Sequence, residues 1–181
     1  RPFFRDVNAL FDTRIDLFYS RRIGDIQHGE KIAGKLGPFQ VAGIYARTHS
    51  FGENDDYFPE ANYTAVRLQK DILSASTLGI TAVEKSWHGG YHRSIGIDTK
   101  MRLPDQFYVT GQFVATWPGN LWDHAGGFVR IARENNDYNY HLRYTSYGKK
   151  FMDNLNATGL IYSSAVLNFG SGRTCTRQSK T

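Results

Sequence analysis

The chain has 181 residues, enough for one domain with a hydrophobic core of its own. Its 40% hydrophobic and 22% charged residues indicate a folded protein rather than a disordered one. The formal net charge is +5, but Lys and Arg are spread along the chain, so we expect no nucleic-acid partner. No apolar stretch approaches the roughly 20 residues of a membrane-spanning helix, which excludes a helical membrane protein. The one cysteine, Cys175, excludes an internal disulfide and a cysteine-based zinc site.

The first residues, Arg1-Pro2-Phe3-Phe4, include neither an initiator Met nor an apolar signal segment, as expected of a processed chain or a fragment. The string Leu17-Phe18-Tyr19-Ser20-Arg21-Arg22-Ile23-Gly24 follows, and then one amphipathic β-hairpin after another to about residue 147. Strands are predicted over 30–36, 39–48, 62–72, 77–87, 92–103, 106–117, 125–133 and 138–147.

The most regular strands lie on either side of the turn at Pro104-Asp105. Apolar and polar residues alternate there with a period of two, which a helix does not produce. The alternation places an apolar set on one face of the sheet: Ile95, Ile97, Met101, Phe107, Val109 and Phe113. It places a polar set on the other face: Asp98, Lys100, Arg102 and Gln112.

Hairpins with no helix between them leave few architectures, because the sheet must close on itself or stack on a second one. We therefore predict an all-β fold, an antiparallel up-and-down meander of about 8–10 strands that forms a barrel or part of a barrel. Residues 1–170 are expected to form a single β-barrel-like domain or a fragment of a longer barrel, and 171–181 a polar basic tail. A membrane barrel fits because its strands need only about 10 residues of alternating polarity.

The connections between strands alternate in length. Short turns are predicted at 37–38, 73–76 and 104–105, and longer connections at 49–61, 87–91 and 117–124. Short turns at one end and long loops at the other are typical of outer-membrane barrels. Four aromatic residues near strand ends are candidates for an interfacial girdle: Trp87, Tyr91, Trp117 and Trp122. In a soluble sandwich or barrel the same residues would fill the rim.

Charged residues are expected near one face of the sheet. The candidates for a lumenal or ligand-facing surface are Arg21, Arg22, Lys35, Arg67, Asp98, Lys100, Arg102, Arg130 and Arg143, accompanied by Lys31, Lys70 and Glu134. In a barrel they would line a polar lumen. That lumen is either a pathway or site for anionic or sugar-like solutes, or a solvated, ion-paired interior without transport.

Three strings carry a family resemblance. They are Pro2-Phe3-Phe4 with the run 16–24, the run 33–39, and the run 63–71. They resemble a family of largely uncharacterised bacterial outer-membrane proteins in which a module similar to family 9 of carbohydrate-binding modules precedes a β-barrel domain of unknown function. The resemblance covers about residues 1–147 and does not include the module, so sugar binding is not carried over. The polar, basic C-terminal residues lack the aromatic strand end expected of such barrels, which favours a fragment of a longer barrel.

Chemistry has little support in the sequence. Four histidines (His88, His92, His124 and His141) and Asp123 show no metal-ligand spacing, and the acidic residues Glu53, Asp55, Asp56 and Glu60 lack a calcium-loop pattern. No nucleophile elbow, phosphate loop or dinucleotide fingerprint occurs. Asp98 and Glu134 could face each other across a lumen, but the sequence does not give the carboxylate separation that glycoside hydrolysis requires. We predict no catalytic residues, metal or cofactor, and the sequence leans against an enzyme.

The predicted function is therefore an outer-membrane β-barrel domain with a structural or passive solute- or carbohydrate-handling role. Its expected location is the bacterial outer membrane, and its expected partners are lipid and either carbohydrate or other proteins of an outer-membrane assembly. The alternative is a soluble β-barrel or sandwich module that binds a carbohydrate or another polar ligand on its aromatic and charged face. The two differ in which face of the sheet is dry, and alternation alone does not decide that.

Overall fold

The structure is a computed structural model in which the described residues are 9–18, 23, 25–50, 59–73, 75–121, 123–134, 138–151 and 163–171. For Glu134, Tyr138 and 163–171 the description covers the backbone alone. Among the candidates for the lumenal surface and the aromatic girdle, Arg21, Arg22 and Trp122 lie outside the described residues.

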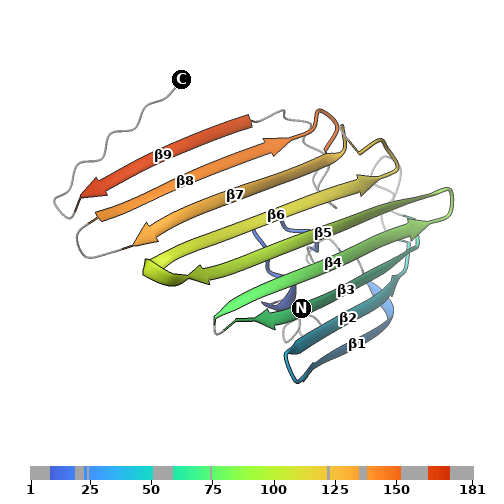
Figure 1. Ribbon diagram of the computed structural model, residues 1–181. Helices are drawn as coiled ribbons and strands as arrows, with labels where there is room; N and C mark the ends of the chain where they lie inside the picture. The colour runs from blue at the N-terminus through green and yellow to red at the C-terminus, as the bar shows by residue number, and fades with distance from the viewer. Residues whose placement is uncertain are drawn as a thin grey trace.

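The described chain forms one nine-stranded antiparallel sheet in which every strand pairs with its neighbours in sequence (Figure 1). The strands are β1 (Ile26–Leu36), β2 (Phe39–Thr48), β3 (Ala61–Ile72), β4 (Ser76–Trp87), β5 (Gly90–Leu103), β6 (Phe107–Trp117), β7 (Ala125–Glu134), β8 (Tyr138–Tyr147) and β9 (Ser163–Ser171). A single turn of 3-10 helix, η4 (Pro104–Gln106), joins β5 to β6. The predicted all-β up-and-down meander is confirmed. The described sheet is open, with β1 and β9 as its edges.

The connections differ between the two ends of the sheet. At one end they are short, at 37–38, 73–75, 104–106 and 135–137. At the other end they are 49–60, 88–89, 118–124 and 148–162. The expectation of a longer connection at 87–91 is wrong, because β4 and β5 continue to a tight turn at His88-Gly89. Gly89 has a φ of +105°, a backbone conformation that glycine adopts without a steric penalty.

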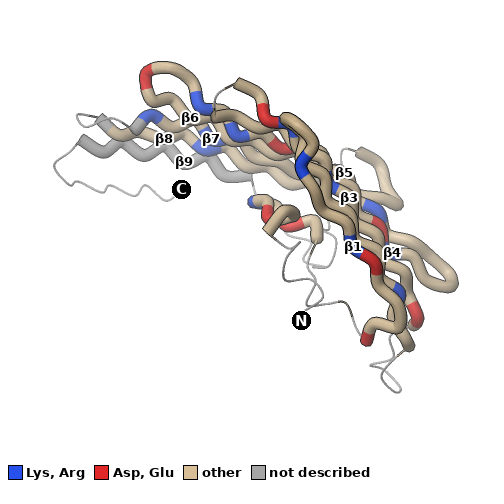
Figure 2. Tube along the Cα trace, turned by 90° about the horizontal axis from the view of Figure 1, so that it is seen from below, with Lys and Arg blue, Asp and Glu red and all other residues tan. Residues whose placement is uncertain are grey.

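The sheet is arched, and residues 9–18 lie on its concave side (Figure 2). We call this segment the strap. Its side chains alternate between buried and exposed, and the buried ones are Phe11, Thr13, Ile15 and Leu17. Residues 9–11 form a short helical turn and the rest of the strap runs on without regular structure, so the strap presents one face to the sheet without joining it as a strand.

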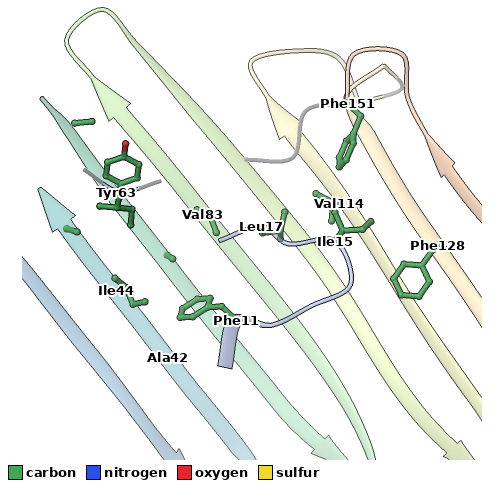
Figure 3. Packing of buried hydrophobic residues seen from close by; sticks show 14 residues of the cluster. Phe11, Ile15, Leu17, Ala42, Ile44, Tyr63, Val83, Val114, Phe128 and Phe151 are labelled. Atoms are coloured by element: carbon green, nitrogen blue, oxygen red, sulfur yellow. The ribbon is translucent and has the colours of Figure 1, made fainter. Parts of the chain in front are cut away.

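The hydrophobic core lies between the strap and the concave face of the sheet. Phe11, Ile15 and Leu17 pack over small and branched residues of β2 to β6 (Figure 3), among them Ala42, Ile44, Ala65, Val83 and Val114. Gly96 on β5 makes the close approach possible, because a Cβ there would lie 2.6 Å from Cδ1 of Leu17. The core is thus one layer thick and belongs to the concave side alone.

Candidate functional surfaces

The convex face of the sheet carries a continuous apolar surface. The strand register aligns Val41, Leu68, Ile80, Ile97 and Phe113 in one row across β2 to β6. Ile97 is 48% exposed and Phe113 50% exposed, so the row is not covered by the rest of the described chain. Apart from Leu73 and Leu121 in connections, every exposed large hydrophobic side chain of the described residues lies on this face: Ile32, Leu36, Phe39, Val41, Val66, Leu68, Leu78, Ile80, Tyr91, Ile95, Ile97, Leu103, Phe113, Val129, Ile131, Leu142 and Tyr144. We call this surface the apolar band.

Charged side chains border the apolar band at both ends of the strands. At the end with the longer connections, Arg93 pairs with Glu84 at 2.7 Å and lies 5.4 Å from the ring of Tyr91. At the short-turn end, Lys70 lies 5.3 Å from the ring of Phe39, and Arg133 lies 5.2 Å from the ring of Phe107. Stacking of a cation on an aromatic ring lets its apolar stem cover the band while the charge stays at the border.

The aromatic residues predicted to form a girdle divide between the faces. Tyr91 and Trp117 lie at convex positions, opposite Ser86 and Arg93, and Trp87 lies at a concave position between Ala61 and Gly90. All three are at the end of the sheet with the longer connections. Trp87 and Tyr91, but not Trp117, line a mostly apolar hollow of about 430 Å³ together with His92, Pro118 and His124. Aromatic and histidine rings therefore gather at this rim.

The concave face collects the charged residues expected together. The register places Lys31, Lys35, Arg67, Asp98, Lys100, Arg102, Arg130 and Arg143 at concave positions. Lys70 is the exception, because it pairs with Phe39 and Leu78 on the convex face. Lys70 and Arg67 are three residues apart on β3, and an odd separation places two side chains of a strand on opposite faces.

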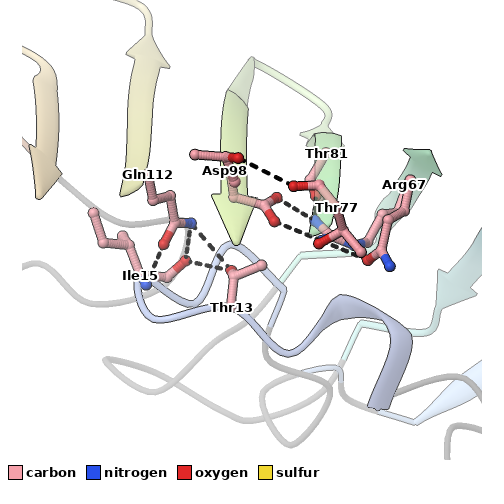
Figure 4. A network of polar contacts seen from close by, with 9 residues as sticks. Thr13, Ile15, Arg67, Thr77, Thr81, Asp98 and Gln112 are labelled. Carbon is pink, nitrogen blue, oxygen red and sulfur yellow. Dashed lines mark hydrogen bonds and ion pairs between the residues drawn. The ribbon is translucent and has the colours of Figure 1, made fainter. Parts of the chain in front are cut away.

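A buried ion pair lies at the centre of the concave face (Figure 4). Arg67 donates two hydrogen bonds to the carboxylate of Asp98, at 2.6 and 2.8 Å, and a third to Thr81 at 2.6 Å. Arg67 is 5% and Asp98 8% exposed. Gly79 on the intervening strand leaves room, because a Cβ there would lie 2.7 Å from Nη2 of Arg67. The bidentate geometry offsets the cost of removing two charges from water.

A glutamine holds the strap to the sheet beside this pair (Figure 4). The backbone N–H of Ile15 donates to Oε1 of Gln112 at 2.7 Å, and Nε2 of Gln112 donates to the carbonyl of Ile15 at 2.9 Å. Nε2 of Gln112 also donates to the hydroxyl of Thr13 at 3.1 Å. Because Gln112 and Asp98 are opposite each other in the register, one polar layer runs from Arg67 through Asp98 to the strap.

The strap and its contact with Gln112 were not predicted from the sequence. The alternation of Phe11, Thr13, Ile15 and Leu17 with charged residues is the signal that could have revealed a segment with one buried face. Gln112, the partner of the strap in the sheet, has no comparable sequence signal. The strap binds its side-chain amide and does not pair with the backbone of a strand.

Asp123, His124 and Glu60, three of the remaining ionisable candidates, have structural partners. Asp123 accepts a hydrogen bond from Asn120 at 3.0 Å, and Nδ1 of His124 lies 3.2 Å from the carbonyl of Asn120. Glu60 pairs with Arg47, whereas Glu53, Asp55 and Asp56 lie outside the described residues. Over the described part of the chain, no three His, Cys, Asp or Glu side chains group closely enough to hold a metal ion. The same residues contain no helix long and apolar enough to cross a membrane.

Comparison of the chain with known protein families, with curated proteins and with solved structures finds no match. The family resemblance of residues 1–147 therefore stays a prediction from the sequence.

Proposed function

We propose that this chain forms part of the wall of a β-barrel in the bacterial outer membrane, with a structural or passive solute-handling role. The convex face contacts lipid, and the concave face borders the lumen, where the strap packs against the wall. The observation that carries this proposal is the apolar band, an exposed hydrophobic surface that spans the sheet on the side away from the core.

The orientation of the large apolar side chains favours a membrane protein over a soluble module. In a soluble barrel or sandwich, the apolar residues of each strand form the core and the charged residues face water. Here Ile80, Ile97 and Phe113 are exposed, while Arg67 and Asp98 are buried on the concave face. Soluble monomers rarely expose apolar patches larger than a few hundred Å².

The dimensions of the strands also support the proposal. The strands are between 9 and 14 residues long, and a tilted membrane-crossing strand needs about 9–11 residues. The cations on aromatic rings at both borders, such as Arg93 at Tyr91 and Arg133 at Phe107, suit the two interfaces between lipid and water.

A carbohydrate-handling role is supported by one feature, the hollow at the rim of the sheet. The rim hollow near Trp87 and Tyr91 offers aromatic faces of the kind on which sugar rings stack, and its volume of about 430 Å³ is within the usual range of ligand pockets. Under the proposal this rim lies at one membrane interface, where carbohydrate or another protein of an outer-membrane assembly would meet it.

Fractionation tests the proposal first. The full chain, expressed with an export signal, should sediment with outer membranes, resist extraction by salt or alkali, and need detergent to stay in solution. A chain that is monomeric in buffer without detergent would contradict the proposal.

Cysteine labelling then tests which face meets lipid. In a Cys175→Ser background, Ile80→Cys at the centre of the apolar band should be protected from a water-soluble maleimide in membrane vesicles. Lys100→Cys on the concave face should react. Equal reactivity at both positions would contradict the assignment of the faces.

A further inference from the structure

The rim hollow lies at one end of β5, and its lining follows the order of the strands. Trp87 comes from the end of β4, His92 from β5 and Thr116 from β6. Pro118 and His124 come from the connection between β6 and β7. An indole on one side of β5, and a proline ring and an imidazole on the other, therefore border a space of about 430 Å³.

Two glycines allow the rings of the hollow to lie close to the backbone. Gly90 is opposite Trp87 in the register, and a Cβ there would lie 2.9 Å from Cζ2 of the indole. A Cβ at Gly119 would lie 2.3 Å from Nδ1 of His124. A larger residue at either position would displace a ring, so the shape of the hollow depends on both glycines.

Hydrogen bonds hold His124 in place. Its backbone N–H and its Nδ1 lie 3.1 and 3.2 Å from the carbonyl oxygen of Asn120. Its own carbonyl accepts hydrogen bonds from the backbone N–H and the hydroxyl of Thr116, at 2.9 and 3.0 Å. A carbonyl oxygen can only accept, so Nδ1 of His124 carries the proton and Nε2 is the acceptor of the neutral ring.

Trp87 is also held by its surroundings. Its side chain packs against the hydrophobic core, and Nζ of Lys85 lies 5.5 Å from its ring. Lys85 is not part of the lining of the hollow. The part of the indole that borders the hollow is therefore not the part that the lysine contacts.

The composition of the lining points to a class of ligand. Among the described residues that line the hollow, none is Lys, Arg, Asp or Glu, so a phosphate or carboxylate would enter it without an opposite charge. Flat rings with a few polar atoms suit a ligand that has an apolar face and hydrogen-bonding edges. A neutral pyranose has both, because its C–H groups form an apolar face and its hydroxyl groups lie around the edge.

We propose that the rim hollow binds a neutral pyranose, with the C–H face of the sugar on the indole of Trp87 and a sugar hydroxyl donating to Nε2 of His124. This assignment rests on the carbohydrate-handling part of the proposed function and names its ligand class and contact residues. The lining between these two contacts contains His92 and Thr116, so other sugar hydroxyls meet polar side chains there.

Saturation-transfer NMR titration of the full chain, in a polyoxyethylene detergent without a sugar headgroup, tests the site. The probes are methyl β-glucoside, methyl β-galactoside, glucuronate and glycerol. The neutral glycosides should bind, and the ratio of their affinities identifies the preferred sugar. Glucuronate should bind at least about fivefold more weakly, because its carboxylate loses water without gaining a cation. Glycerol should not bind, since it has no ring to stack on the indole.

Matched variants separate the hollow from the rest of the rim. Trp87→Leu should weaken glycoside binding about tenfold or more, because it removes the flat ring and keeps an apolar side chain. Trp117→Leu is the control, since Trp117 lies at the same end of the sheet on the convex face and should change the affinity by less than about twofold.

The role of the imidazole has its own pair of variants. His124→Phe keeps a ring and removes Nε2, so it should weaken binding about five- to tenfold. His88→Phe, in the exposed turn between β4 and β5, should leave the affinity unchanged. Far-ultraviolet circular dichroism confirms that each variant retains the β spectrum.

Three results would overturn the sugar site: a folded chain that binds neither glycoside, equal losses for Trp87→Leu and Trp117→Leu, or glucuronate that binds as tightly as the glycosides. The proposed function fails separately. A chain that is monomeric in buffer without detergent and binds glycosides through Trp87 would overturn the membrane assignment and leave the sugar site intact.

Discussion

The two faces of the sheet are built from alternate residues of the same strands, yet they differ in every physical respect. On the convex face, Ile80 and Ile97 are neighbours in the register and have no cover in the described chain. On the concave face, Thr81 and Gly96 are neighbours one residue along, and Leu17 of the strap covers Gly96. The convex face thus has exposed large apolar side chains and no core, and the concave face has the core, in which Ile44 and Phe128 are buried beside the polar residues Arg67 and Asp98. Such an inversion suits a wall with lipid on its outer side.

The buried ion pair should give the largest effect on the concave face. We expect Arg67→Met to lower the free energy of unfolding by about 3–5 kcal/mol, because it leaves Asp98 buried without its partner. Urea titration in lipid vesicles, followed by tryptophan fluorescence, measures this. Lys35→Met breaks the exposed pair with Asp71, whose atoms are 2.7 Å apart, and should cost no more than about 1 kcal/mol. Similar costs for the two variants would mean that the Arg67–Asp98 pair is as accessible to water as the exposed Lys35–Asp71 pair.

A charge placed in the apolar band probes the convex face. Ile97→Arg should cost about 2–4 kcal/mol in lipid vesicles, because the guanidinium would lie near the bilayer midplane. Thr64→Arg lies on the same face in the border row with Glu84 and should cost about 1 kcal/mol or less. An Ile97→Arg protein as stable as the parent would show that the band is in contact with water.

The glycine beneath the ion pair provides a smaller test. Gly79→Ala should cost about 1–3 kcal/mol, since the new methyl group would lie 2.8 Å from Oδ2 of Asp98 and force the pair apart. A Cβ at Gly34 on β1 would meet no described heavy atom within 4 Å, so Gly34→Ala should be neutral or stabilise by up to about 1 kcal/mol. Equal unfolding midpoints would contradict the packing around Gly79.

The contact of the strap with Gln112 gives the smallest expected effect. Gln112→Leu should cost about 1–2 kcal/mol, because the peptide group of Ile15 loses both hydrogen bonds to the side chain. Hydrogen exchange at the Ile15 amide should accelerate by about tenfold or more. Gln40→Leu, at a concave position of β2, should leave that exchange rate unchanged. Unchanged exchange in Gln112→Leu would show that the apolar contacts alone hold the strap.

The sequence predicted strands where alternation was strong. β2 and β8 have the predicted bounds, and the hairpin of β5 and β6 brings Ile97 opposite Phe113 and Asp98 opposite Gln112 as expected. The ninth strand, β9, was not predicted. The turn at His88-Gly89 is shorter than expected, because a glycine pair is as compatible with the end of two long strands as with a loop.

The interactions within the concave face were not predictable in the same way. Alternation assigns Arg67 and Asp98 to a face but does not say that they meet, because that depends on the registers of β3 with β4 and of β4 with β5. Those registers follow from turn lengths and from the fit of Gly79 under the pair. The strap was missed for a related reason, since its partner is a side chain almost a hundred residues away rather than an adjacent strand.

The Arg67–Asp98 contact also distinguishes the native strand register from shifted ones. A slip of β5 by two residues would keep every side chain on its proper face, so the apolar pattern alone would not reject it. In one direction, however, Lys100 would take the place of Asp98 beside Arg67 and replace attraction by repulsion. In the other direction Gly96 would arrive there and leave the guanidinium buried without an acid. Both shifted registers are therefore less stable than the native one, so the carboxylate of Asp98 favours the correct alignment of β3, β4 and β5.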